Sequence, residues 1–115
     1  MRPEETTLGL GVFQWVGESG HKYRYSVHMF GTAFGQGPAN FVFARELRPG
    51  QYQANYMGET ADLSEPFNDY EVMQCIKLHR VTHIHVRHAS EREDVRRAEC
   101  ADLIARWNPP CNRSR

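Results

Sequence analysis

The sequence lacks an excess of charge of either sign. Its 115 residues contain 14 Lys plus Arg and 14 Asp plus Glu, so the formal net charge at pH 7 is zero. Because a protein that neutralises nucleic-acid phosphates usually carries a basic surplus, bulk charge gives nucleic-acid binding no support. Arginines nevertheless gather near the C-terminus, at Arg106, Arg113 and Arg115. These side chains are either a solvated helix end or a local patch for phosphate contacts.

Long apolar runs are also missing. No stretch approaches the length of a membrane span, and MRPEETTLG at the N-terminus has charge with no apolar run behind it. We therefore expect neither a membrane segment nor a signal peptide. Cysteine is scarce, and Cys75, Cys100 and Cys111 are odd in number and fit no paired metal-binding spacing. A disulfide framework is not expected, and the composition favours a reducing, cytoplasmic setting.

Alternation of apolar and polar residues, together with turn signals, predicts five β-strands. The first two, VFQWV and HKYRYSVHM, flank the turn cluster GESG. The next two, NFVFARE and YQANYMG, flank a Pro-Gly turn, and RVTHIHVRH alternates again further along. Strands joined by such short turns are typical of β-hairpins, so we expect two hairpins and a fifth strand.

Two segments have helical spacing. Residues 62–80 mix polar and apolar positions at this spacing, with Pro66 as an interruption. Near the C-terminus, Ser90 and Glu93 have the spacing of a capping box, which predicts that a helix starts there. Its apolar stripe consists of Cys100, Leu103, Ile104 and Trp107, and two prolines follow. The order hairpin, hairpin, helix, strand, helix predicts one domain of the α+β class.

Two separated segments, YMGETADL at 56–63 and LIARWNPPCN at 103–112, resemble the GIY-YIG nuclease superfamily. The family is named after two tripeptides on paired strands. A helix follows the second tripeptide, and a later helix ends in an apolar pair, a proline and an asparagine. The resemblance covers about residues 38–112. It implies a GIY-YIG-like domain at 38–115, a small antiparallel sheet flanked by helices, with 1–37 as an N-terminal arm and β-hairpin extension.

The resemblance implies hydrolysis of a phosphodiester bond. In the family, two strand tyrosines act on the attacking water, and an arginine on the first helix holds the phosphate. A glutamate on the later helix binds one divalent ion such as Mg²⁺, and the final asparagine braces the site. The metal and the cation both stabilise charge on the phosphoryl oxygens. Of these positions, Tyr56, Tyr70 and Asn112 match the family pattern.

The groups that perform the chemistry depart from the pattern. Phe41 stands at the position of the first tyrosine and lacks the hydroxyl, and Pro66 stands where the arginine is expected. Proline in a first helical turn is harmless to the helix. Cys100 occupies the register of the metal-binding glutamate, and a thiol is a poor ligand for a hard cation. Glu99, one place away, is the candidate metal ligand.

Three hypotheses on function follow from these matches and departures. The first is a nucleic-acid-associated module, with DNA as the favoured partner, whose nuclease activity is weak or absent. The second is an active endonuclease in which Glu99 binds Mg²⁺ or another divalent ion. The third is a structural or protein-interaction domain, which the zero net charge favours.

The strand RVTHIHVRH also admits a zinc site. His83 and His85 share one strand face, and Cys75, His79 or His88 could complete the ligand set. The alternative is a half-exposed strand face whose histidines have no metal to bind. Aromatic and basic residues of the first hairpin, among them Trp15 and Tyr25, either stack on bases or cover the core.

Overall fold

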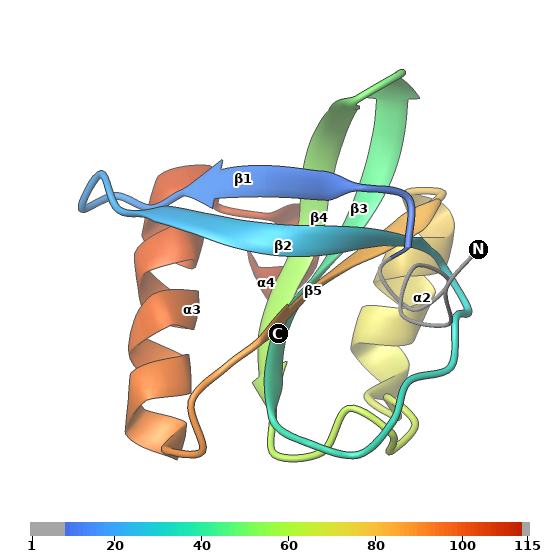
Figure 1. The fold of residues 1–115 in the computed structure, drawn as a ribbon. Helices are drawn as coiled ribbons and strands as arrows, with labels where there is room; N and C mark the ends of the chain where they lie inside the picture. The colour runs from blue at the N-terminus through green and yellow to red at the C-terminus, as the bar shows by residue number, and fades with distance from the viewer. Residues whose placement is uncertain (1–8, 114–115) are drawn as a thin grey trace.

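The computed structural model of the protein describes residues 9–113. Five antiparallel strands form one curled sheet in the order β1-β2-β5-β3-β4, with helices on its two sides (Figure 1). The strands are β1 Val12–Val16, β2 Lys22–Met29, β3 Ala39–Arg48, β4 Gln51–Thr60 and β5 His83–His88. The helices are α2 Tyr70–Leu78, α3 Glu93–Trp107 and α4 Pro110–Arg113. The α+β class, the two hairpins and the fifth strand are confirmed.

The N-terminal hairpin is part of the same sheet as the rest of the chain. Its second strand, β2, pairs antiparallel with β5, with Val27 opposite His85 and Ser26 opposite Val86. The other side of β5 pairs with β3. Residues 12–29 therefore extend the sheet that the later strands form, and β5 lies at its centre.

The two faces of the sheet bury two separate hydrophobic clusters because neighbouring strand residues point to opposite faces. Phe41, Phe43 and Tyr56 pack on one face with Val72 and Ile76 of α2. The other face packs against α3 and contributes Trp15, Tyr25, Val42, Ala44 and Met57, which surround Leu103. We call these the α2 face and the α3 face.

Helix α2 begins later than the spacing of residues 62–80 predicts. The structure has no helix between 61 and 69, and Asp69 caps α2 by accepting a hydrogen bond of 3.1 Å from the Val72 amide. Asp62 instead closes a local turn through the amide and hydroxyl of Ser64. Proline also disfavours helical geometry in the residue before it, here Glu65. The prediction that Pro66 lies in a first helical turn is therefore wrong.

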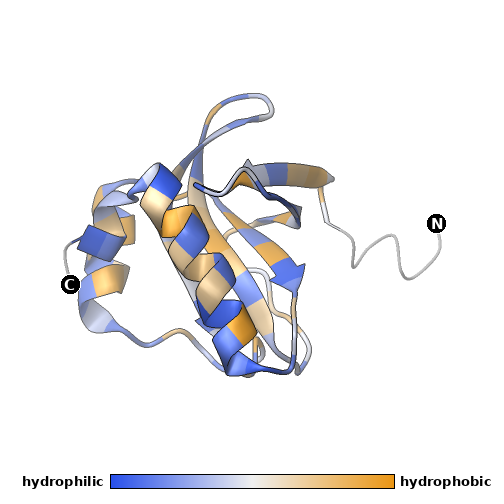
Figure 2. Ribbon diagram, turned by 90° about the vertical axis from the view of Figure 1, so that its left-hand side faces the viewer, coloured by the Kyte–Doolittle hydropathy of each residue, from blue (hydrophilic) through white to orange (hydrophobic). Residues whose placement is uncertain are grey.

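Helix α3 begins at Glu93, but the predicted capping box does not form. The N-cap residue is Arg92, which makes no side-chain capping bond, and the hydroxyl of Ser90 accepts from the Arg92 amide. Arg96 and Glu99 are buried along α3 beside the apolar Leu103. Hydrophilic and hydrophobic residues alternate along this helix, which faces the viewer in Figure 2.

The end of α3 leads directly into α4. Asn108 adopts a left-handed conformation with φ of 44° and ends α3, and Pro109 is buried. Helix α4 packs against β4 and α2. This packing places Cys111 beside Cys75, and the two form a disulfide with a Cα–Cα separation of 5.6 Å. The prediction against disulfides is wrong here, because 36 residues separate the two cysteines and only the fold brings them together.

Within residues 9–113, none of the helices combines the length and the apolar character needed to cross a membrane.

Candidate functional site

A groove on the α2 face lies beside the segment that the family resemblance singles out. It has a volume of about 550 Å³ and lies between the β2–β3 connection, the end of β4 and residues 63–68. Aromatic rings and Pro66 form much of its lining; the rings belong to Phe30, Phe34, Phe41, Phe43 and Phe67. Its charged lining residues are Glu59 and Glu65, and no Lys or Arg is among the described residues that line it.

The glycine of YMG is required by the close approach of an aromatic ring. Phe41 on β3 lies directly opposite Gly58 on β4. A Cβ atom at position 58 would lie 2.7 Å from Cζ of Phe41 and 2.8 Å from Cε2 of Tyr56. Both distances are shorter than real Cβ contacts allow. Gly58 therefore leaves room for the outer edge of the Phe41 ring, which stands at the position where the family has a tyrosine.

Phe67 completes this aromatic cluster. Its ring centroid lies 5.8 Å from that of Phe41, 5.4 Å from Phe43 and 5.5 Å from Tyr56. Edge-to-face contacts at such distances are favourable because the positive edge of one ring meets the negative face of another. Pro66 precedes this anchor and lines the groove. The position expected to hold a phosphate-binding arginine therefore contributes apolar surface.

The two tyrosines of the expected site differ in their surroundings. Tyr56 is only 8% exposed and lies in the cluster of the α2 face. Tyr70 is the first residue of α2 and is 74% exposed. Both belong to the α2 side of the sheet, where Phe41 and Pro66 also lie.

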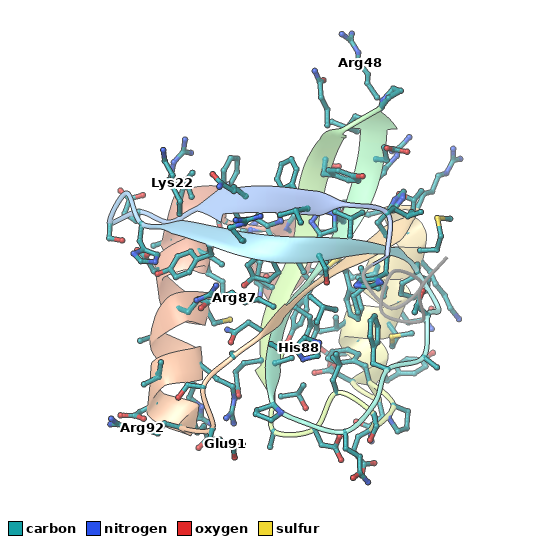
Figure 3. All side chains as sticks on the ribbon, viewed as in Figure 1. Lys22, Arg48, Arg87, His88, Glu91 and Arg92 are labelled. Carbon is teal, nitrogen blue, oxygen red and sulfur yellow. A yellow bond between two sulfur atoms is a disulfide. The ribbon has the colours of Figure 1, made fainter. Side chains whose placement is uncertain are left out.

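Glu99 lies on the opposite face. Its Oε2 accepts a hydrogen bond of 2.7 Å from the hydroxyl of Tyr25 on β2, and its Oε1 accepts one of 2.9 Å from Nε of Arg87 on β5. Arg87 extends toward α3 and also lies 5.6 Å from the ring centroid of Tyr23 (Figure 3). Burial, together with the nearby Glu99 carboxylate, raises the pKa of Tyr25 well above its ordinary value. The structure does not bring Glu99 together with Tyr56 or Tyr70.

These contacts decide whether Glu99 suits a divalent cation. Both carboxylate oxygens already accept hydrogen bonds, and the side chain is 9% exposed. The guanidinium of Arg87 occupies the place where a cation would gain most from the carboxylate. A hard ion such as Mg²⁺ keeps several waters and needs open space around its carboxylate ligand. The residues around Glu99 therefore do not fit a magnesium site.

Cys100 and Asn112 meet at the backbone of Met57. The Asn112 side chain accepts from the Met57 amide at 2.8 Å and donates to the Met57 carbonyl at 2.9 Å. The Cys100 thiol points to the same carbonyl at 3.5 Å. Because β4 is an edge strand, the Asn112 amide satisfies backbone groups that no further strand pairs with. Burial, with Glu59 and Glu99 nearby, raises the pKa of Cys100 to about 12, which disfavours a reactive thiolate.

The C-terminal arginines are exposed where the structure describes them. The guanidinium of Arg106 lies over the ring of Trp107, 4.6 Å from its centroid, and Arg113 ends α4. Arg115 lies outside the described residues. Arg96, in contrast, is buried and donates a hydrogen bond of 2.9 Å to Glu59 at the rim of the groove.

The strand histidines are engaged with their neighbours. Trp15 donates from Nε1 to Nδ1 of His85 at 2.9 Å, and His83 lies 2.8 Å from the Thr82 hydroxyl. Among residues 9–113, a group with the spacing that a metal ion could use consists of Cys75, His79 and Cys111. Cys75 and His79 were named in the zinc hypothesis for the strand, but Cys111 was not, since its sequence position gives no sign of this contact.

Sequence reasoning also missed the partners of Glu99. Arg87 and Tyr25 lie in strands whose apolar and polar residues alternate, and this pattern indicated only which sheet face each residue belongs to.

Comparisons of the chain with protein-family models, with curated proteins and with solved structures find no match.

Proposed function

We propose that this chain is a GIY-YIG-like module that associates with nucleic acid and has weak or no nuclease activity. The observation that carries the proposal is the engagement of Glu99 by Tyr25 and Arg87 on the α3 face, away from Tyr56. A hydrolytic site of the family type needs this carboxylate beside the strand tyrosines. With Glu99 held elsewhere, the groove keeps a binding surface and lacks the charged groups that stabilise a phosphoryl transition state.

The groove itself supports recognition of unpaired bases. Stacking on aromatic rings is tolerant of sequence because every base has a π-face. Phe30 is 41% exposed at the groove, and its ring centroid lies 5.6 Å from that of Phe43. Exposed Arg106 and Arg113 offer phosphate contacts, which are independent of base sequence. A single-stranded nucleic acid is therefore the favoured partner, and the family resemblance favours DNA.

Binding and cleavage are measured separately. Fluorescence anisotropy with labelled single-stranded, duplex and branched DNA, and with RNA, is run at low salt and then at increasing salt. Replacing Phe30 by Ala is expected to weaken single-strand binding by roughly five-fold or more, the effect of losing one stacked base. Leu78→Ala is the matched control, because Leu78 is 80% exposed at the end of α2 and does not line the groove. Absence of binding to every nucleic acid contradicts the proposal.

A plasmid-nicking assay with Mg²⁺ or Mn²⁺ tests the hydrolytic alternative. We expect no nicking above background by the wild-type chain. Metal-dependent nicking that disappears in Glu99→Ala, with the fold retained, would instead support the active endonuclease.

A second candidate function is protein interaction. The observation in its favour is that the groove is apolar and has the acidic Glu65 in its lining, while its other acid, Glu59, is paired with Arg96. Such a groove suits a peptide with an aromatic or aliphatic anchor beside a basic residue. Binding of such peptides, lost in Phe30→Ala, together with no nucleic-acid binding would favour this function.

A further inference from the structure

We propose that Cys75, His79 and Cys111 form a zinc-binding site when the disulfide between the two cysteines is reduced. One ligand atom from each residue, two sulfurs and an imidazole nitrogen, lies within 4.8 Å of the other two. This group is separate from Glu99 and uses neither strand histidine. It requires no carboxylate and no part of the expected nuclease chemistry.

The last turn of α2 positions two of the three ligands. Cys75 and His79 are four residues apart, so their side chains share one face of the helix. His79 is the C-cap residue, and its amide donates to the Cys75 carbonyl at 3.0 Å. Arg80 follows with a positive φ of 58° and ends the helix. The last turn therefore holds both ligands in a defined place.

Helix α4 supplies the third ligand. Cys111 is fully buried and packs in the same cluster as Val72 and Ile76 of α2. The next residue, Asn112, is fixed to β4 through its two hydrogen bonds to Met57. Cys111 is therefore held between α2 and the sheet, so the site forms without a large movement of the backbone.

The donor set selects the ion. Two thiolates and one imidazole suit Zn²⁺ or its substitute Co²⁺, whereas Mg²⁺ and Ca²⁺ prefer oxygen ligands. Two thiolate charges neutralise a divalent ion, which suits a site beside a hydrophobic cluster. Cys75 and His79 are half-buried, so the fourth position of a tetrahedral ion is open to a water molecule.

The disulfide and the metal site exclude each other, because both use the same two sulfurs. An external dithiol reduces the disulfide: the Cys75–Cys111 S–S bond breaks, two S–H bonds form and the dithiol becomes a disulfide. Zinc binding then forms two S–Zn bonds and one N–Zn bond, and the two thiol protons pass to solvent. Reducing conditions therefore favour the metal form, and oxidising conditions favour the disulfide.

The test uses the full chain, freshly reduced with a phosphine, and Zn²⁺ in competition with a chromophoric chelator. We expect one Zn²⁺ per chain, with about two protons released as the thiols ionise. Co²⁺ should give the sulfur-to-metal charge-transfer and visible bands of a tetrahedral thiolate site. The oxidised chain should bind neither ion. Failure of the reduced wild-type chain to compete for Zn²⁺, or binding without proton release, overturns the proposal.

Single substitutions assign the ligands. His79→Gln and Cys75→Ser change half-buried side chains and should weaken Zn²⁺ binding at least about tenfold. Cys100→Ser and His88→Gln are the matched controls and should bind as the wild type does, since neither residue belongs to the group. Circular dichroism verifies the fold of each variant. Equal affinity of His79→Gln, Cys75→Ser and the wild type overturns the assignment.

Discussion

The hydroxyl of Tyr25 donates a hydrogen bond of 2.7 Å to the buried carboxylate of Glu99, and this bond ties α3 to the N-terminal hairpin. A second acid of α3, Asp102, accepts from the amide and hydroxyl of Ser19 and from the hydroxyl of Tyr23. Trp107 donates to the carbonyl of Val16 at 2.8 Å. The inward side of α3 therefore anchors the hairpin that β1 and β2 form.

Replacing Glu99 by Gln is expected to destabilise the fold. The amide is neutral, so Arg87 loses its ion pair, and Tyr25 keeps a hydrogen bond only by turning its hydroxyl to accept from the amide NH₂. The free energy of unfolding should fall by about 1–3 kcal/mol, because hydrogen bonds to a charged group are replaced by weaker neutral ones. Urea denaturation measures it, and a double-mutant cycle with Tyr25→Phe should show non-additivity. Glu93→Gln, at an exposed position in the first turn of α3, is the control. An unchanged midpoint for Glu99→Gln would contradict this structural role.

Gly58→Ala is expected to destabilise the protein through overpacking. The new Cβ would press on the ring of Phe41, and displacing that ring disturbs its contacts with Phe67. We expect a loss of about 1–3 kcal/mol in a urea titration. Gly35→Ala serves as the control, because a Cβ at position 35 meets no atom within 4 Å. Equal stability of the two variants would show that the Phe41 ring is free to move.

The periodic parts of the fold could be predicted from the sequence. Alternation of side chains identified β1, β2 and β5, and the Pro-Gly turn identified β3 and β4, whose residues do not alternate clearly because β3 is buried on both faces. The start of α2 could not be predicted this way, since its position depends on Asp69 as a cap and on a turn closed by Asp62. Spacing alone cannot choose between several capping residues in one polar stretch.

Contacts between segments that are distant in the sequence could not be predicted from the sequence. Counting along the helix placed Glu99 and Cys100 relative to the family pattern, but it could not tell which face of the sheet each side chain would meet. The hairpin at residues 12–29 supplies Tyr25 as the partner of Glu99, and this hairpin has no counterpart in the resemblance. The Cys75–Cys111 contact likewise depends on α4 packing against α2.

Asn112 is expected to protect the edge of the sheet. In Asn112→Ala the Met57 amide loses its acceptor, so its hydrogen exchange should accelerate while amides in the β3–β5 pairing keep their protection. The free energy of unfolding should fall by about 1–2 kcal/mol. Asn112→Asp should cost more, because a carboxylate oxygen would then face the Met57 carbonyl. Asn68→Ala, at an exposed position, is the control, and unchanged exchange at Met57 in Asn112→Ala would contradict the bracing role.

Acid is expected to destabilise the fold through His85. Its Nδ1 accepts the hydrogen bond from Trp15, so the folded protein holds a neutral ring. Burial above all, with charge on His83 and His28 as lesser causes, lowers the pKa of His85 to about 3. The unfolded chain takes up this proton near pH 6.5 and therefore binds more protons between the two pKa values. Stability should fall as pH drops from about 6.5 toward 3, by up to about 1.4 kcal/mol per pH unit for this one group.

Urea denaturation at several pH values, with His85→Gln beside the wild type, checks this dependence. The variant cannot titrate at this position, so its stability should vary less steeply with pH below 6.5. Part of the slope should remain, because burial also lowers the pKa of His28. His88→Gln removes an exposed histidine and should follow the wild-type curve closely. If His85→Gln and the wild type lose stability in parallel, the protonation that unfolds the protein in acid belongs to another group.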